Sequence, residues 1–226
     1  MPGRLSAVLF DMDGTLLDSE KLWAVGLSDL CARLGFTMDE ALRGRLVGMD
    51  HMQSMRRLHS ELGIGQDGVH DSAEWLLKRM GELFRGGVVW QPGAQELVHQ
   101  VREAGLATGL VTATKRVLVD VIVSTIDPNQ FDVSVCGDEV AHNKPDPQPY
   151  AEAMRKLGVP ARECIAIEDS KTGVTSAVAA GCPVLAVPSE VAIDGDDDVT
   201  VAPNLIDIDV EALRTVHGRW FDAGRG

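Results

Sequence analysis

Five short apolar runs alternate with helical patterns, and this alternation limits the possible fold more than any other feature of the chain. The apolar runs have the length of buried strands and lie at residues 5–10, 107–112, 131–136, 164–167 and 183–187. Helical patterns fill the gaps at residues 92–104, 115–126, 148–157 and 172–180. Because strands that alternate with helices pair in parallel, the sequence predicts an α/β protein with a doubly wound, Rossmann-like parallel sheet.

Residues 19–86 interrupt this alternation, because they contain helical patterns and no convincing strand. Apolar side chains recur on one helical face in three stretches, and each stretch predicts a helix with one buried side. Thr37 and Glu40 have the spacing of a capping box, which predicts a helix with Thr37 as its N-cap. We therefore expect an inserted α-helical domain at 19–86 and an α/β core domain formed by residues 1–18 and 87–226.

The charge of the chain excludes some classes of partner. It has 34 acidic and 21 basic residues among 226, a formal charge of −13. Nucleic acids and anionic membranes attract clustered Lys and Arg, so neither is an expected partner. The four cysteines lack zinc-type spacing, and the chain shows no signal-peptide pattern or membrane-length apolar stretch. We therefore expect free thiols and a cytoplasmic location.

The first apolar run ends in Asp11-x-Asp13-Gly14, which places two carboxylates two residues apart. Strand geometry puts both on one side, at the carboxyl edge of the sheet, where open α/β folds bind ligands. Two carboxylates so close repel each other, and a divalent cation relieves that repulsion. The alternative is a turn in which both side chains bind backbone groups. An EF-hand is excluded, because Leu16 and Leu22 occupy the positions that require Gly and Glu.

Other polar residues are predicted at the same edge. Thr112 ends the second run, where its hydroxyl can donate to an anion or cap the next helix. Lys144 precedes two prolines, which favours either a fixed ammonium group beside the carboxylates or a surface lysine in a turn. Glu168 and Asp169 follow the fourth run. There they need a cation or hydrogen bonds, unless Asp169 only caps the following helix.

Together these residues predict one polar site at one edge of the sheet. Their order, their places at strand ends and the helical insert make the chain resemble the haloacid dehalogenase (HAD) superfamily. Within it, the chain is most similar to phosphatases and phosphomutases with a helical cap. The resemblance spans essentially the whole chain, and the motif that carries it most specifically is Asp11-x-Asp13-Gly14-Thr15-Leu16-x-Asp18.

The resemblance implies a mechanism and a set of site residues. Asp11 would attack phosphorus and form an aspartyl phosphate, while Asp13 would protonate the leaving oxygen and then activate water. Thr112 and Lys144 would neutralise the phosphoryl oxygens. The implied cofactor is Mg²⁺, held by Asp11, Asp13 through its backbone carbonyl, and Asp169, with Glu168 acting through water or by holding Lys144. The implied substrate contacts are Gly14, Thr15, Ala113, Lys115, Arg45 and His51.

We therefore expect a Mg²⁺-dependent phosphatase, monomeric or homodimeric, for a small phosphorylated metabolite such as a sugar phosphate or phosphoglycolate. Asp13 stands where similar dehalogenases carry Tyr, which disfavours hydrolysis of a carbon–halogen bond. One alternative is a β-phosphoglucomutase-like phosphomutase. This chain has Trp23 and His51 where that branch has a His and an Arg, and the difference favours hydrolysis.

Two further possibilities stay open. The basic residues Lys21, Arg43, Arg45 and Arg56 could bind a second phosphate. A phosphoacceptor signalling module similar to receiver domains, or a binding module without catalysis, would use a different chemistry. Receiver-like domains place their acceptor Asp after a later strand, and the Asp-x-Asp motif on the first strand argues against that class.

Overall fold

The computed structural model describes residues 4–46, 49, 51–127, 129–189, 191–196 and 198–222. Within these residues the sheet is parallel, with the strand order β3-β2-β1-β4-β5-β6. The strands are β1 (Ala7–Phe10), β2 (Ala107–Val111), β3 (Val133–Val135), β4 (Cys164–Glu168), β5 (Val184–Ala186) and β6 (Val199–Val201). The predicted α/β class with a doubly wound parallel sheet is confirmed.

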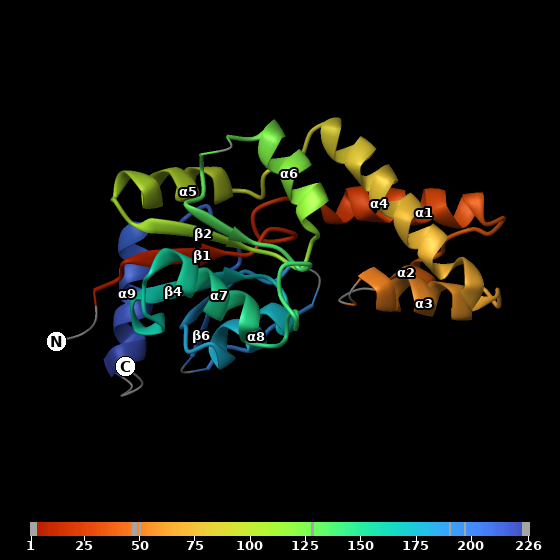
Figure 1. Ribbon diagram of the computed structural model, residues 1–226. Helices are drawn as coiled ribbons and strands as arrows, with labels where there is room; N and C mark the ends of the chain where they lie inside the picture. Colours follow the sequence, from red (N-terminus) through yellow and green to blue (C-terminus); the bar gives the residue numbers. More distant parts are fainter. Residues whose placement is uncertain are drawn as a thin grey trace.

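Helices cover both faces of this sheet (Figure 1). They are α5 (Ala94–Glu103), α6 (Arg116–Thr125), α7 (Gln148–Leu157), α8 (Lys171–Ala179) and α9 (Val210–Asp222), with a 3₁₀ turn η2 (Ala161–Glu163) before β4. Val8 and Phe10 of β1 pack into the core that contains α5, α6 and α9, whereas Ala7 and Leu9 pack into the core that contains α7 and α8. Because successive side chains enter opposite cores, each strand is an unbroken apolar run.

The predicted strands and core helices are confirmed, with their ends within two residues of the expected positions. The sequence reasoning missed β6 and α9. β6 is three residues long and follows an acidic stretch, so it has no apolar run of its own. Its position depends on pairing, since Val199 lies in register with Val184 of β5.

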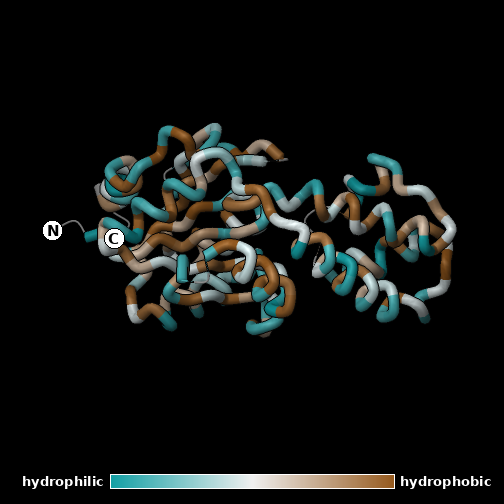
Figure 2. The backbone as a smooth tube through the Cα atoms, turned by 90° about the horizontal axis from the view of Figure 1, so that it is seen from above, coloured by the Kyte–Doolittle hydropathy of each residue, from teal (hydrophilic) through white to brown (hydrophobic). Residues whose placement is uncertain are grey.

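Four helices between β1 and α5 lie together at one end of the molecule, and we call them the cap (Figures 1 and 2). They are α1 (Glu20–Arg33), α2 (Glu40–Gly44), α3 (His51–Glu61) and α4 (Val69–Arg85), with a 3₁₀ turn η1 (Gln66–Gly68) before α4. The described residues of the cap contain no strand. α4 packs against α1 and α3 within the cap and against α6 of the core. We keep residues 19–86 as the proposed extent of a cap domain.

The predicted start of the second cap helix is wrong. Thr37 is not its N-cap: Asp39 takes this position, and its carboxylate accepts a hydrogen bond from the backbone N–H of Leu42 at 2.7 Å. Asp caps a helix at least as well as Thr does, and Asp39 immediately precedes the first helical residue. The capping-box spacing therefore pointed to the correct helix but to the wrong residue.

Two simple properties complete the description. In the part of the chain that the structure describes, no helix combines the length and the hydrophobicity that a membrane crossing requires. The four cysteines, Cys31, Cys136, Cys164 and Cys182, are buried and free, as predicted.

Candidate active site

The predicted polar residues meet at one edge of the sheet. β1 pairs in parallel with both β2 and β4, so the carboxyl ends of these three strands reach the same edge. Asp11 follows β1, Thr112 follows β2, Glu168 is the last residue of β4 and Asp169 follows it. Lys144 reaches them from the loop before α7. Asp11, Thr112, Lys144 and Asp169 line a cavity of about 310 Å³, which we call the core cavity.

Lys144 lies at the centre of this cluster, with its side chain only 5% exposed. Its ammonium group donates to Asp11 Oδ1 at 2.6 Å, to Glu168 Oε1 at 2.6 Å and to the backbone carbonyl of Val111 at 2.8 Å. Burial lowers the pKa of Lys144, but the charges of Asp11 and Glu168 outweigh this effect and hold that pKa above its usual value. The surface-lysine alternative is therefore excluded.

Glu168 is fully buried, and both of its oxygens have hydrogen-bond donors. Oε1 accepts from Lys144 and from the Tyr150 hydroxyl at 2.7 Å, while Oε2 accepts from the Ser170 hydroxyl at 3.2 Å. Gly173 in α8 leaves room for this carboxylate, because a Cβ atom there would overlap it. Ser170 is also the N-cap of α8 and accepts from the Gly173 N–H. Glu168 is thus placed to hold Lys144.

Asp11 and Asp169 form the part of the site that fits a metal ion. Among the described residues, carboxylate oxygens of Asp11, Glu168 and Asp169 lie within 4.8 Å of one another. Asp11 Oδ2 is buried without a hydrogen-bond partner, whereas Asp169 accepts from Ser189 at 2.5 Å and from Thr15 at 3.2 Å. An unpartnered oxygen in a buried cluster of three carboxylates leaves uncompensated negative charge, which a hard divalent cation bound to the cluster relieves.

The three carboxylates of this cluster carry more negative charge than Lys144 balances. Burial raises the pKa of Asp11 well above its usual value, and the pull of Lys144 in the opposite direction does not cancel this rise. Burial also raises the pKa of Asp169 to about 6. Glu168 adds repulsion to both carboxyl groups. Three carboxylates thus face one ammonium group, and the donor set of hard oxygens suits a cation such as Mg²⁺ better than a soft metal.

Gly14 is required next to this cluster for two reasons. Its φ of +84° lies in the left-handed region, and a Cβ atom would overlap the Asp169 carboxylate. Its backbone carbonyl accepts from the Gln91 side chain at 3.1 Å. The two residues that we predicted from this motif as substrate contacts, Gly14 and Thr15, therefore shape the cluster, and Thr15 donates directly to Asp169.

Asp13 points away from the acidic cluster and towards the cap. Its Oδ1 accepts from the Ser19 hydroxyl at 2.6 Å and from the Trp23 indole N–H at 3.3 Å. Its Oδ2 accepts from the hydroxyls of Thr112 at 3.2 Å and Thr114 at 2.7 Å. The Asp13 carboxylate is thus outside the three-carboxylate group, and ligation through its backbone carbonyl stays a prediction.

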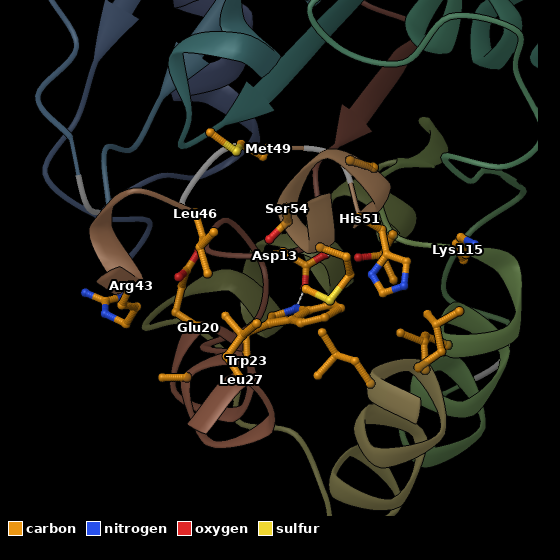
Figure 3. A pocket seen from close by; sticks show the side chains of 17 residues that line it. Asp13, Glu20, Trp23, Leu27, Arg43, Leu46, Met49, His51, Ser54 and Lys115 are labelled. Atoms are coloured by element: carbon orange, nitrogen blue, oxygen red, sulfur yellow. Dashed lines mark hydrogen bonds between the residues drawn. The ribbon is translucent and has the colours of Figure 1, made fainter. Parts of the chain in front are cut away.

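A second cavity of about 230 Å³ lies between the cap and the loop after β2, and we call it the cap cavity (Figure 3). Asp13, Glu20, Met49 and Ala113 line both this cavity and the core cavity, so the two adjoin at Asp13. Much of its wall is apolar and comes from the side chains of Trp23, Leu27, Leu46, Met55, Leu76 and Leu118. The cap cavity offers space for a group that extends from the core cavity past Asp13.

Three of the four remaining predicted substrate contacts line the cap cavity, and Arg45 does not. Ala113, Lys115 and His51 line the cap cavity, and the His51 ring also lies 3.0 Å from the carbonyl of Ala73. Arg45 lines neither the core cavity nor the cap cavity, and pairs with Glu61 at 3.0 Å. Arg43, two residues earlier, lines the cap cavity instead.

Sequence reasoning missed several residues that hold the site together. Thr114 follows Thr112 at the spacing of a strand, and that signal was available. Tyr150 and Ser189 bind Glu168 and Asp169 from 18 and 20 residues away, with no sequence pattern to mark them. In the sequence Trp23 is notable only because it stands where the phosphomutase branch has a His, and no pattern shows that its indole N–H donates to Asp13.

Comparisons with known proteins agree with this geometry. Residues 8–187 match the family of haloacid dehalogenase-like hydrolases. The chain is 31% identical to the protein CbbY of Rhodobacter capsulatus, over 94% of this chain and 97% of that protein. It is also 31% identical to a phosphorylated carbohydrates phosphatase of Thermotoga maritima, over 78% of this chain and 82% of the relative.

A solved structure shows the same architecture. A variant of CbbY from Rhodobacter sphaeroides in complex with xylulose-1,5-bisphosphate superposes with a TM-score of 0.80 at 25% identity, covering 92% of this chain and 99% of the other. The fold and the acidic cluster define an enzyme of the α/β class with its site at the carboxyl edge of a parallel sheet. This chain belongs to the haloacid dehalogenase-like hydrolases, so the predicted resemblance and the enzyme class are confirmed.

Proposed function

We propose that this enzyme is a Mg²⁺-dependent phosphatase that hydrolyses a phosphate monoester of a small phosphorylated sugar. The observation that carries this proposal is Asp11, whose Oδ2 is buried and unpartnered in a cavity also lined by Lys144 and Thr112. Such an oxygen is positioned as a nucleophile because Lys144 already holds the other oxygen of the same carboxylate. The relatives named as phosphatases of phosphorylated carbohydrates support the same function.

The chain's own residues account for both halves of the reaction. In the first step Asp11 Oδ2 attacks phosphorus, the bond to the leaving oxygen breaks, and Asp13 gives that oxygen its proton. In the second step Asp13 takes a proton from water, the water oxygen attacks phosphorus, and the bond between phosphorus and Asp11 breaks, which releases phosphate and the free carboxylate. Lys144 and the Thr112 hydroxyl lie at the cavity wall, where they can neutralise phosphoryl oxygens.

The metal requirement follows from the acidic cluster. Asp11 and Asp169 would hold Mg²⁺ directly, together with the predicted backbone carbonyl of Asp13, while Glu168 is fully engaged by its own donors. When bound, Mg²⁺ supplies the positive charge that neutralises the transferring phosphoryl group and the three carboxylates. The carboxylate oxygens that the cluster offers are the ligands this ion prefers.

The cap cavity is the proposed place for the sugar, because it adjoins the core cavity at Asp13, the group that would protonate the leaving oxygen. One relative was crystallised with a pentulose bisphosphate, and another is named for phosphorylated carbohydrates. A cytoplasmic location, and a monomer or homodimer as the active form, complete the proposal.

The decisive experiment is a phosphate-release assay of the purified protein with Mg²⁺ or with EDTA. The substrates are hexose and pentose phosphates, sugar bisphosphates, phosphoglycolate and nucleotides. We expect phosphate to be released from sugar phosphates in the presence of Mg²⁺ and not in the presence of EDTA. If none of these esters releases phosphate with Mg²⁺, the proposal is wrong. β-Glucose 1-phosphate is assayed separately for glucose 6-phosphate, since formation of that product would favour the phosphomutase alternative.

A further inference from the structure

Trp23 contacts both Asp13, the proposed proton donor, and another helix of the cap. It lies in α1, where its indole N–H donates to Asp13 Oδ1 and its ring lines the cap cavity (Figure 3). The ring also packs against Phe84 of α4, with ring centroids 6.1 Å apart and ring planes at 79°. Among the described residues four side chains donate to Asp13, and Trp23 is the one that lies within a cap helix, since Ser19 precedes α1 and two threonines follow β2.

The chemistry of these donors differs in a way that bears on proton transfer. The hydroxyls of Thr112 and Thr114, which face Oδ2, can either donate or accept a hydrogen bond. They therefore suit Oδ2 with or without a proton. An indole N–H can only donate, so Oδ1 must remain an unprotonated acceptor while it faces Trp23. The proton that Asp13 transfers is thereby assigned to Oδ2.

We propose that Trp23 is a positioning residue that fixes the orientation of Asp13 for proton transfer to the leaving oxygen. The proposal rests on the proposed function, which gives Asp13 that role. Packing against Phe84 restricts rotation of the indole ring. The direction of its N–H therefore depends on how α1 packs against α4.

This role predicts a dependence on the leaving group that a structural role would not produce. A sugar alkoxide is a poor leaving group and needs the proton from Asp13, whereas p-nitrophenolate leaves without protonation. Loss of the Trp23 hydrogen bond should therefore slow phosphoryl transfer from a sugar phosphate much more than from p-nitrophenyl phosphate. Any general damage to the fold or to the fraction of active protein would lower both rates by the same factor.

The test compares Trp23→Phe with the wild type and with Trp75→Phe as a matched control. Phenylalanine keeps a ring against Phe84 and in the cavity wall but removes the N–H. Trp75 is a partly buried tryptophan of the same cap, stacked under Arg33 at 5.5 Å, and it lines neither the core cavity nor the cap cavity. For each protein, kcat and KM are measured with p-nitrophenyl phosphate and with the best sugar phosphate, and kcat/KM reports the first phosphoryl transfer.

Trp23→Phe is expected to lower kcat/KM for the sugar phosphate about tenfold, through kcat, and that for p-nitrophenyl phosphate less than about twofold. Trp75→Phe should leave the ratio of kcat/KM for the sugar phosphate to kcat/KM for p-nitrophenyl phosphate unchanged. An equal loss on both substrates would overturn the inference, as would a loss confined to KM. If the wild type hydrolyses p-nitrophenyl phosphate but no sugar phosphate, the proposed substrate class fails. Phenyl phosphate, whose leaving group is more basic, then replaces the sugar in the same comparison.

Discussion

The core cavity and the cap cavity meet at Asp13 but are built in opposite ways. In the core cavity, charged groups from strand ends and from the loop before α7 bind one another, and Lys144 donates to two carboxylates and a carbonyl. In the cap cavity, much of the wall is apolar and comes from helix faces. The difference indicates that the sheet positions the reacting groups, while packing of the cap helices determines the shape of the substrate that fits beside them.

The largest effect is expected from Asp11→Asn, which tests the core half of this comparison. An amide is a very poor nucleophile, so phosphate release should fall by at least roughly a thousandfold. The substitution keeps the shape of the side chain and an oxygen that can accept from Lys144. Circular dichroism and thermal melting should therefore show a folded protein. Activity close to that of the wild type would exclude Asp11 as the nucleophile.

Lys144→Met should produce the next largest effect, this time on stability. It leaves Asp11, Glu168 and Asp169 in one buried cluster without their ammonium counter-charge. Breaking a buried ion pair from one side costs about 3–5 kcal/mol. Urea unfolding in EDTA should show a loss of that size, part of which Mg²⁺ restores.

Lys115→Met provides the matched control for this substitution. Lys115 lies at the start of α6, is partly exposed and lines the cap cavity. Its loss should change the free energy of unfolding by less than about 0.5 kcal/mol. Equal losses for the two variants would mean that Lys144 is not a counter-charge within a buried cluster.

Binding of Mg²⁺ should stabilise the protein more as the pH rises. Without metal, burial holds the pKa of Asp11 well above its usual value and that of Asp169 at about 6, both above their unfolded values. These groups thus bind protons more tightly when folded, and the metal-free protein loses their contribution to stability as the pH rises through those values. Metal binding needs the deprotonated carboxylates and removes their repulsion.

The measurement is thermal melting with and without Mg²⁺ at pH 5 and pH 8. At roughly a hundredfold excess of Mg²⁺ over its Kd the stabilisation is about 2.7 kcal/mol, or roughly 5–10 °C for a chain of this size, at pH 8. A clearly smaller shift is expected at pH 5. Asp169→Asn should reduce the shift at pH 8. A shift that is independent of pH would contradict binding at this cluster.

The core half of the site could be predicted because it depends on where the strands end. The carboxyl ends of parallel strands lie at one edge of the sheet, so Asp11, Thr112 and Glu168 were expected there once the strands were recognised, and β1 pairs with both β2 and β4. The links made by Ser189 and Tyr150 could not be predicted, since each depends on how a distant loop or helix packs.

The sequence predicted that the cap is made of helices, but not which residues of each helix face the cap cavity. Which side of a short helix faces a cavity depends on its rotation about its own axis, and two residues along a helix differ by roughly 200°. Arg43 and Arg45, at the end of α2, are separated by that turn, and only Arg43 lines the cap cavity. The sequence showed that the cap has basic residues, but only the packing of α2 shows which of these two arginines lines the cap cavity.

The same pair of arginines gives the smallest predicted effect and the sharpest test of the cap. Arg43→Ala should raise KM for a sugar phosphate by about tenfold, which corresponds to the loss of one charged hydrogen bond to the substrate. The kcat value should change little, because Arg43 lines the cap cavity and not the core cavity. Arg45→Ala should change KM by less than about twofold, since its guanidinium is already paired with Glu61 at the surface. Steady-state kinetics on the two variants decides the matter. The reverse order of effects would place Arg45 against the substrate, and would mean that α2 rotates when the cap closes on its ligand.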